Sequence, residues 1–90
     1  MTNEEIIARK AISEGLFTEE EIVRRIRQDE DIPLHTVKGW KDRGYTVKRG
    51  ERGVACRLWR QKLSANGEES QFYQTKSFLF RQDQVEKGEQ

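Results

Sequence analysis

Basic and aromatic side chains are interleaved in one segment of the chain, residues 38–62, which reads KGWKDRGYTVKRGERGVACRLWRQK. The segment holds both tryptophans, one of the two tyrosines and nine of the seventeen Lys and Arg residues. Its only acids are Asp42 and Glu51, so it carries +7, whereas the rest of the chain carries −6. Cations can meet phosphates and rings can stack on bases, so the segment is typical of a surface for a flexible polyanion with exposed bases.

The turn at residues 48–53 is the first place where this chemistry is concentrated. Lys48, Arg49 and Arg52 lie within a few residues of Gly50 and Gly53. Glycine allows positive φ angles and a close approach of the backbone to a ligand, and backbone N–H groups could join the cations around phosphate oxygens. Charged turns are also common on protein surfaces, and the turn taken alone favours that solubilising role.

The expected strand at residues 54–61 is the second place. Arg57 and Trp59 share one of its faces, while Arg60 and Lys62 share the other near its end. The better core residues are Val54, Cys56 and Leu58. We therefore expect Trp59 on the open side, beside guanidinium groups, as a stacking platform for bases. The alternative is a buried Trp59 with Arg57 extending along the edge of the core.

The other aromatic residues are expected either to pack in the core or to contact a ligand. Trp40 follows Val37 on a short helix and is expected to anchor the core. Tyr45 opens the first strand and could serve either purpose. Three residues on one face of the last strand are expected in the core: Phe72, Phe78 and Phe80. Lys76 lies between them and would be an edge cation. The candidate nucleic-acid-binding residues are Lys41, Tyr45, Lys48, Arg49, Arg52, Arg57, Trp59, Arg60, Lys62 and Lys76.

Enzymatic and metal-binding classes find little support in the residues. His35 is the only histidine and Cys56 the only cysteine, so we expect no structural zinc, no cofactor and no catalytic group. His35 is expected to be solvent-exposed or to cap a helix. The first residues lack the apolar stretch of a signal peptide, and no stretch approaches the roughly 20 apolar residues of a membrane span, which favours the cytoplasm.

The elements that must position these side chains follow from caps and periodicity. Thr2 and Thr18 each precede a glutamate by three residues, which predicts two short helices over residues 1–28 with a break at Gly15. A third short helix is expected over residues 36–43. From residue 45 the apolar period changes to two, which predicts strands up to residue 80.

One domain, residues 1–90, is therefore expected to have an α+β fold. A helical hairpin and a short helix should pack on a three-stranded antiparallel meander, with a possible short helix over residues 81–87. Asn66-Gly67 predicts a hairpin turn between the second and third strands.

Residues 40–53, WKDRGYTVKRGERG, resemble the W-K-x-x-G-Y-x-V-K-K-G-E-K-G stretch of the ArdC-type N-terminal domain, which belongs to antirestriction proteins of plasmids and conjugative elements. The similarity continues in LWRQK (58–62) and TKSFLFRQDQV (75–85), and TNEEII at the start is similar to stand-alone members. The family binds single-stranded DNA, so the resemblance implies that ligand. It places five residues in the shared motif: Trp40, Tyr45, Lys48, Arg49 and Arg52. Larger members continue into a zinc metallopeptidase domain with H-E-x-x-H, a motif that this sequence does not contain.

Three functions remain open. The leading expectation is a small non-enzymatic domain that binds single-stranded DNA through its basic, aromatic sheet face and the turn. The alternative is a protein-interaction module whose basic face docks on an acidic partner, as an antirestriction inhibitor would. An enzyme fragment with a catalytic domain elsewhere is the third, although the residues supply no catalytic constellation.

Overall fold

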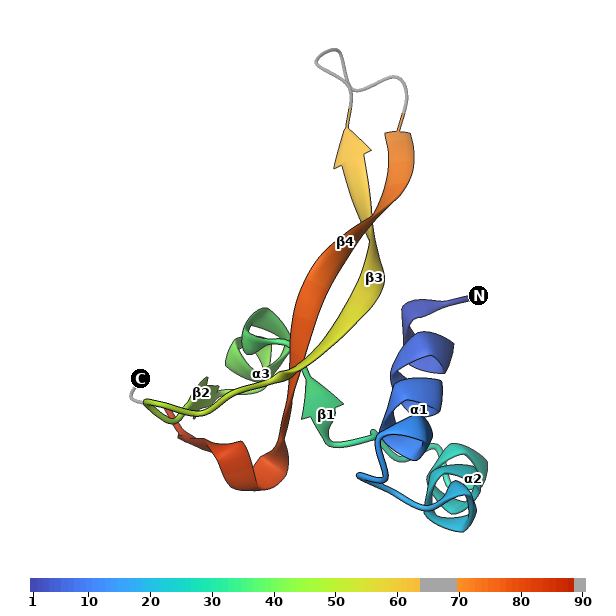
Figure 1. Cartoon of the computed structure of the whole chain (residues 1–90), viewed down its shortest axis with the longest axis vertical. Coiled ribbons are helices and arrows are strands. Elements are labelled where there is room, and N and C mark those ends of the chain that lie inside the picture. Colours follow the sequence, from blue (N-terminus) through green and yellow to red (C-terminus); the bar gives the residue numbers. More distant parts are fainter. Residues whose placement is uncertain (64–69, 89–90) are drawn as a thin grey trace.

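The computed structural model describes residues 1–63 and 70–88. Three α-helices, five strands and one 3₁₀ turn make up this part of the chain (Figure 1). They are α1 (Asn3–Ser13), α2 (Glu19–Arg27), β1 (Leu34–His35), α3 (Val37–Asp42), β2 (Tyr45–Val47), β3 (Val54–Leu63), β4 (Ser70–Arg81), the single 3₁₀ turn η1 (Gln82–Gln84) and β5 (Val85–Lys87). The α+β class is confirmed. In the described residues, no helix has both the length and the apolar character needed to cross a membrane.

All three helices begin after a threonine, as the spacing predicts. Each hydroxyl accepts a hydrogen bond from a backbone N–H of the first turn: Thr2 from Glu5 at 3.2 Å, Thr18 from Glu21 at 3.1 Å, and Thr36 from Gly39 at 3.1 Å. These bonds satisfy donors that the helix itself leaves free. Gly15 follows α1 with φ of +69°, a conformation that suits glycine, and so allows the chain to turn back into α2.

The strands are connected differently from the predicted meander. The three-stranded sheet has the order β1-β4-β3, and β2 pairs with β5 in a separate two-stranded sheet. Two residues are too few for a period-two pattern, so β1 was not expected as a strand. Gly50, with φ of +86°, lies in a turn closed by the Glu51 N–H donating to the Lys48 carbonyl at 3.3 Å. Turns of this geometry splay the flanking strands, so β2 separates from β3. The possible helix over residues 81–87 is replaced by η1 and β5.

The β3–β4 hairpin is the longest element and projects beyond the helices in Figure 1. Its ladder runs without interruption from the pair Val54↔Leu79 to the pair Leu63↔Ser70. These pairs are centred on Asn66-Gly67. The predicted turn itself lies outside the described residues.

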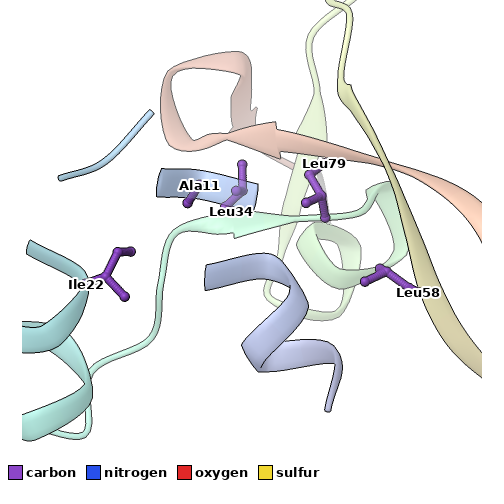
Figure 2. Packing of buried hydrophobic residues seen from close by; sticks show 5 residues of the cluster. All are labelled: Ala11, Ile22, Leu34, Leu58 and Leu79. Atoms are coloured by element: carbon purple, nitrogen blue, oxygen red, sulfur yellow. The ribbon is translucent and has the colours of Figure 1, made fainter. Parts of the chain in front are cut away.

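Two apolar clusters hold the elements together. Figure 2 shows the first, to which α1, α2, β1, β3 and β4 each contribute one buried side chain: Ala11, Ile22, Leu34, Leu58 and Leu79. The second lies under α3 and consists of Trp40, Phe80 and Val85, with Tyr45 and Val47 packed against it. The Trp40 indole N–H donates to the Phe80 carbonyl at 2.8 Å, so Trp40 is the core anchor that the sequence predicts.

His35 contradicts its prediction, because it is buried rather than exposed or capping. Its ring packs edge-on against Trp40 at 4.9 Å, and its Nε2–H donates to the Asp31 carboxylate at 2.7 Å. The Arg43 guanidinium donates to the same carboxylate at 3.0 Å. Burial lowers the pKa of His35 below 6.5, against the raising effect of Asp31. Burial would raise the pKa of Asp31, but the hydrogen bonds from Arg43 and His35 bring it below 3.8.

Candidate nucleic-acid interface

One face of the β3–β4 hairpin carries most of the exposed aromatic surface. Strand alternation and the register put eight residues on this outward face: Ala55, Arg57, Trp59 and Gln61 from β3, and Phe72, Gln74, Lys76 and Phe78 from β4. All eight are exposed. The exposed fractions are 39% for Trp59, 66% for Phe72 and 47% for Phe78. The open face is therefore a row of rings with Arg57 and Lys76 paired across the strands between them.

The expected exposure of Trp59 is confirmed, because the opposite face of the hairpin supplies the core. Leu58 and Leu79 point into the first cluster. The prediction that three phenylalanines form core is wrong for Phe72 and Phe78. Only Phe80 is buried, because α3 covers the outward face at that end of β4.

A groove of about 920 Å³ runs between α1 and this face. Its walls include Trp59, Arg57 and Lys76 from the hairpin, and Arg9 and Lys10 from α1. Four cations and one exposed indole thus line the same groove. In a partly enclosed groove their fields add, which raises the local concentration of an anionic ligand.

The amide side chain of Asn3 fixes the position of α1 against β3. Its Nδ2 donates to the Trp59 carbonyl at 3.0 Å, and the Trp59 N–H donates to its Oδ1 at 2.7 Å. Asn3 therefore pairs with Trp59 as a neighbouring strand would. The first turn of α1 and the backbone of Trp59 are therefore held together beside the groove.

Other groups near the groove modulate its charge. Lys10 forms an ion pair with Glu14 at 3.0 Å, so part of its charge is balanced. Lys76 Nζ lies 5.6 Å from the centre of the Phe78 ring, within the range of a cation–π contact. Burial raises the pKa of the Cys56 thiol above 9.0, with Lys10 acting in the opposite direction. The thiol is therefore protonated at neutral pH and serves as a packing group.

The basic turn at residues 48–53 lies elsewhere. Figure 1 shows it next to β2, on the side of the hairpin base away from α1. Lys48 Nζ donates to the Asp83 carbonyl at 3.2 Å, and Arg49 and Arg52 are exposed. The hydrogen bond from Arg81 lowers the pKa of Asp83, which keeps a carboxylate beside the turn. Three predicted residues, Lys48, Arg49 and Arg52, are thus separate from the groove.

The remaining predicted residues fall into three places. Arg60 lines a smaller hollow of about 490 Å³ that adjoins the groove at Trp59, and Lys62 is exposed further along β3. Lys41 is exposed on α3. Tyr45 packs on Trp40 at 5.3 Å and belongs to the second core cluster, so its ring is not free to stack on a ligand.

Four groove or platform residues were missed from the sequence: Arg9, Lys10, Phe72 and Phe78. Extending the Asn66-Gly67 register along the hairpin would have placed Phe72 and Phe78 on the face of Trp59. For Arg9 and Lys10 no comparable signal exists, because their place depends on how α1 docks beside β3.

In residues 1–63 and 70–88, no three His, Cys, Asp or Glu side chains are grouped so that they could hold a metal ion.

Comparison of the chain with protein-family models, with curated proteins and with solved structures finds no match.

Proposed function

We propose that this chain is a small non-enzymatic domain that binds single-stranded DNA in the groove between α1 and the β3–β4 hairpin. The observation that carries the proposal is the exposed Trp59 ring, which lies among Arg57, Lys76, Arg9 and Lys10. Bases would stack on the ring while the cations meet the phosphates. Base–aromatic stacking contributes about 1–3 kcal/mol per base and is tolerant of sequence.

The spacing of the rings suits an extended strand. Successive outward positions on a β-strand are about 7 Å apart, because each residue advances the strand by about 3.4 Å. The rungs of the outward face are therefore about 7 Å apart, and each ring on them can stack on a base of its own. Phe78, Trp59 and Phe72 occupy the first, third and fourth rungs of the outward face. This face supports contacts to about three or four nucleotides.

Preference for single strands over duplex is part of the proposal. Stacking on Trp59 or Phe72 requires the flat face of a base, which a duplex buries between its neighbouring base pairs. The exposed positions between the rings are filled by two cations and two glutamines, so contacts to phosphate should outweigh base reading, and sequence selectivity should be weak.

The biological setting of the proposal comes from the ArdC-type resemblance of residues 40–53. It suggests a cytoplasmic protein of plasmids or conjugative elements. In this structure the most enclosed residue of that motif, Trp40, is a core anchor, so the motif supports the fold around the hairpin more than it supplies contacts.

Titration of labelled single-stranded and double-stranded oligonucleotides at several salt concentrations tests the proposal. With about five phosphates neutralised, log affinity for the single strand should fall against log salt with a slope near −3 to −4. Tighter binding to the duplex, or an affinity for single strands that does not change with salt, would contradict the proposal.

An acidic protein surface is the second candidate ligand. The observation that favours it is Phe72, whose 66% exposure leaves a large apolar ring in the smaller hollow that adjoins the cationic groove at Trp59. Arg, Tyr, Trp and Phe are the residues that protein interfaces prefer. The two ligands are separated by competition: an oligonucleotide should displace an acidic protein that uses the groove. No oligonucleotide binding at low salt would favour the protein ligand.

A further inference from the structure

We propose that two copies of this chain associate by pairing the free edge of β4 with the same edge of a second copy, antiparallel, along residues Gln71–Thr75. The inference does not depend on the ligand proposed above. It rests on the backbone directions in the hairpin, on the distribution of charge between its two edges and on the exposed rings beside β4.

Among residues 1–63 and 70–88, the only strand that pairs with the edge of β4 facing away from β3 is β1, at one end of β4. β1 pairs with β4 only at Phe80 and Arg81, while β3 pairs with it on the other side. Trp59 directs its N–H and carbonyl away from β4, to Asn3. Trp59 and Gln74 are therefore a non-hydrogen-bonded pair, and Gln74 directs its own N–H and carbonyl to the free edge. By alternation, Phe72 and Lys76 do the same.

The two edges of the hairpin differ in how they are protected. The β3 edge is capped at Trp59 by Asn3 and bordered by α1, and it carries Arg57, Arg60 and Lys62. Charged side chains and coverage are the usual devices that block pairing at an edge. Within β4, the run QFYQT (71–75) has five successive residues without charge, two of them aromatic. Of the two described edges of the hairpin, the β4 edge is therefore the one that can accept another strand.

A second copy fits this edge better than an unrelated strand does, because the pairing is self-complementary. A two-fold axis perpendicular to the sheet, passing near Tyr73, would place uncharged residues opposite uncharged residues and leave Lys76 beyond the paired run. It would also cover part of Phe72 and Tyr73, which are 66% and 45% exposed. The result is a four-stranded sheet, β3-β4-β4-β3, with the outward faces of both copies on the same side.

Proline substitutions give a test with a matched control. Gln74→Pro removes an N–H that points to the free edge of β4 and leaves the β3–β4 hydrogen bonds in place. Gln61→Pro does the same on the β3 edge. Sedimentation velocity of the full chain at concentrations up to about 100 µM should show a dimer for the wild type and for Gln61→Pro, and a monomer for Gln74→Pro.

A wild-type chain that stays monomeric over this range, or a Gln74→Pro variant that dimerises as the wild type does, would overturn the proposal. Circular dichroism checks that each variant is folded. If Gln74→Pro does not fold, Gln74→Lys and Gln61→Lys replace the pair. Like charges near the two-fold axis should weaken the dimer by about two- to fivefold for Gln74→Lys alone. Equal effects of the two lysines would contradict the assignment of the edge.

Discussion

The side-chain amide of Asn3 and the backbone of Trp59 are joined by two hydrogen bonds, at 3.0 Å and 2.7 Å, across 56 positions of sequence. This pairing makes the first residue of α1 act as a short substitute for a strand beside β3. It links the position of a helix to the position of the ring that is central to the proposed interface.

Asn3→Ala should destabilise the fold by about 1 kcal/mol, because the groups that it releases are partly accessible to water. Affinity for single-stranded DNA should fall as well, since α1 would no longer be fixed against Trp59. Chemical denaturation and oligonucleotide titration measure the two effects. Gln61→Ala changes an exposed residue of β3, the strand that contains Trp59. It is the control and should alter stability by less than about 0.5 kcal/mol. An Asn3→Ala variant as stable as this control would show that the pairing contributes nothing.

Mutation of the two tryptophans should affect different properties, stability for Trp40 and DNA affinity for Trp59. Trp40→Phe removes a buried indole and its hydrogen bond to the Phe80 carbonyl, and should cost about 2 kcal/mol of stability. Trp59→Phe should leave stability nearly unchanged, and Trp59→Ala should weaken DNA binding while the chain stays folded. Thermal melts measure the stability of all three variants, and oligonucleotide titrations measure their affinity for DNA. Unfolding of Trp59→Ala would mean that this ring supports the core and would remove the case for stacking.

Stability should fall in mild acid. The unfolded chain takes up a proton at His35 near pH 6.5. The folded chain keeps this ring neutral to a lower pH, because burial lowers its pKa. The stabilisation is therefore complete above pH 6.5 and is lost as the pH falls toward the folded pKa. Below 3.8 the loss of the Asp31 carboxylate adds to the effect in the same direction.

Urea denaturation of the wild type and of His35→Gln between pH 7.5 and 5 measures this dependence. The variant should be less stable at neutral pH but should show a flatter curve over this interval. Because His35 is the only histidine, an equally steep curve in the variant would exclude it as the cause.

Cations of the groove and of the basic turn should differ in their effect on salt dependence. Arg57→Gln and Lys76→Gln should each reduce the magnitude of the log–log salt slope for single-stranded DNA by about 0.7. Arg49→Gln and Arg52→Gln change the same net charge at the turn and should leave the slope almost unaltered. A larger effect from the turn residues would move the interface to the other side of the molecule.

Affinity should rise with oligonucleotide length until the outward face is filled. We expect the steepest gain up to about four nucleotides and a slower gain beyond, as the cations of α1 come within reach. Oligothymidines of increasing length provide the series. Phe72→Ala should shorten the length at which the gain slows, whereas Tyr73→Ala, on the other face of β4, should not.

Local signals predicted the parts of this fold that depend on neighbouring residues. Thr2, Thr18 and Thr36 mark the helix starts, and alternation in residues 54–59 assigns the buried and open faces of β3. The assignment of Trp40 to the core and of Trp59 to the open face follows from these patterns. The same patterns leave the partner of each strand undetermined.

The predictions fail where a segment distant in sequence determines the local pairing or burial. β1 has two residues and becomes a strand only because β4 lies beside it, and β2 finds its partner in β5. Phe72 and Phe78 are of a residue type common in cores, but no helix or strand in the described part of the chain covers the outward face where they lie. His35 is buried because Trp40 and Asp31 surround it, which no periodicity at residue 35 could indicate.

The separate pairing of β2 with β5 also has a consequence for the time at which each part of the molecule can form. The β3–β4 hairpin joins residues close in sequence, whereas β2 must wait for a segment about 40 positions further along. During synthesis on the ribosome, Tyr45 and the rest of β2 therefore stay without a partner strand until β5 has emerged. The α3 region, with its buried indole, is expected to be the last to become protected from hydrogen exchange.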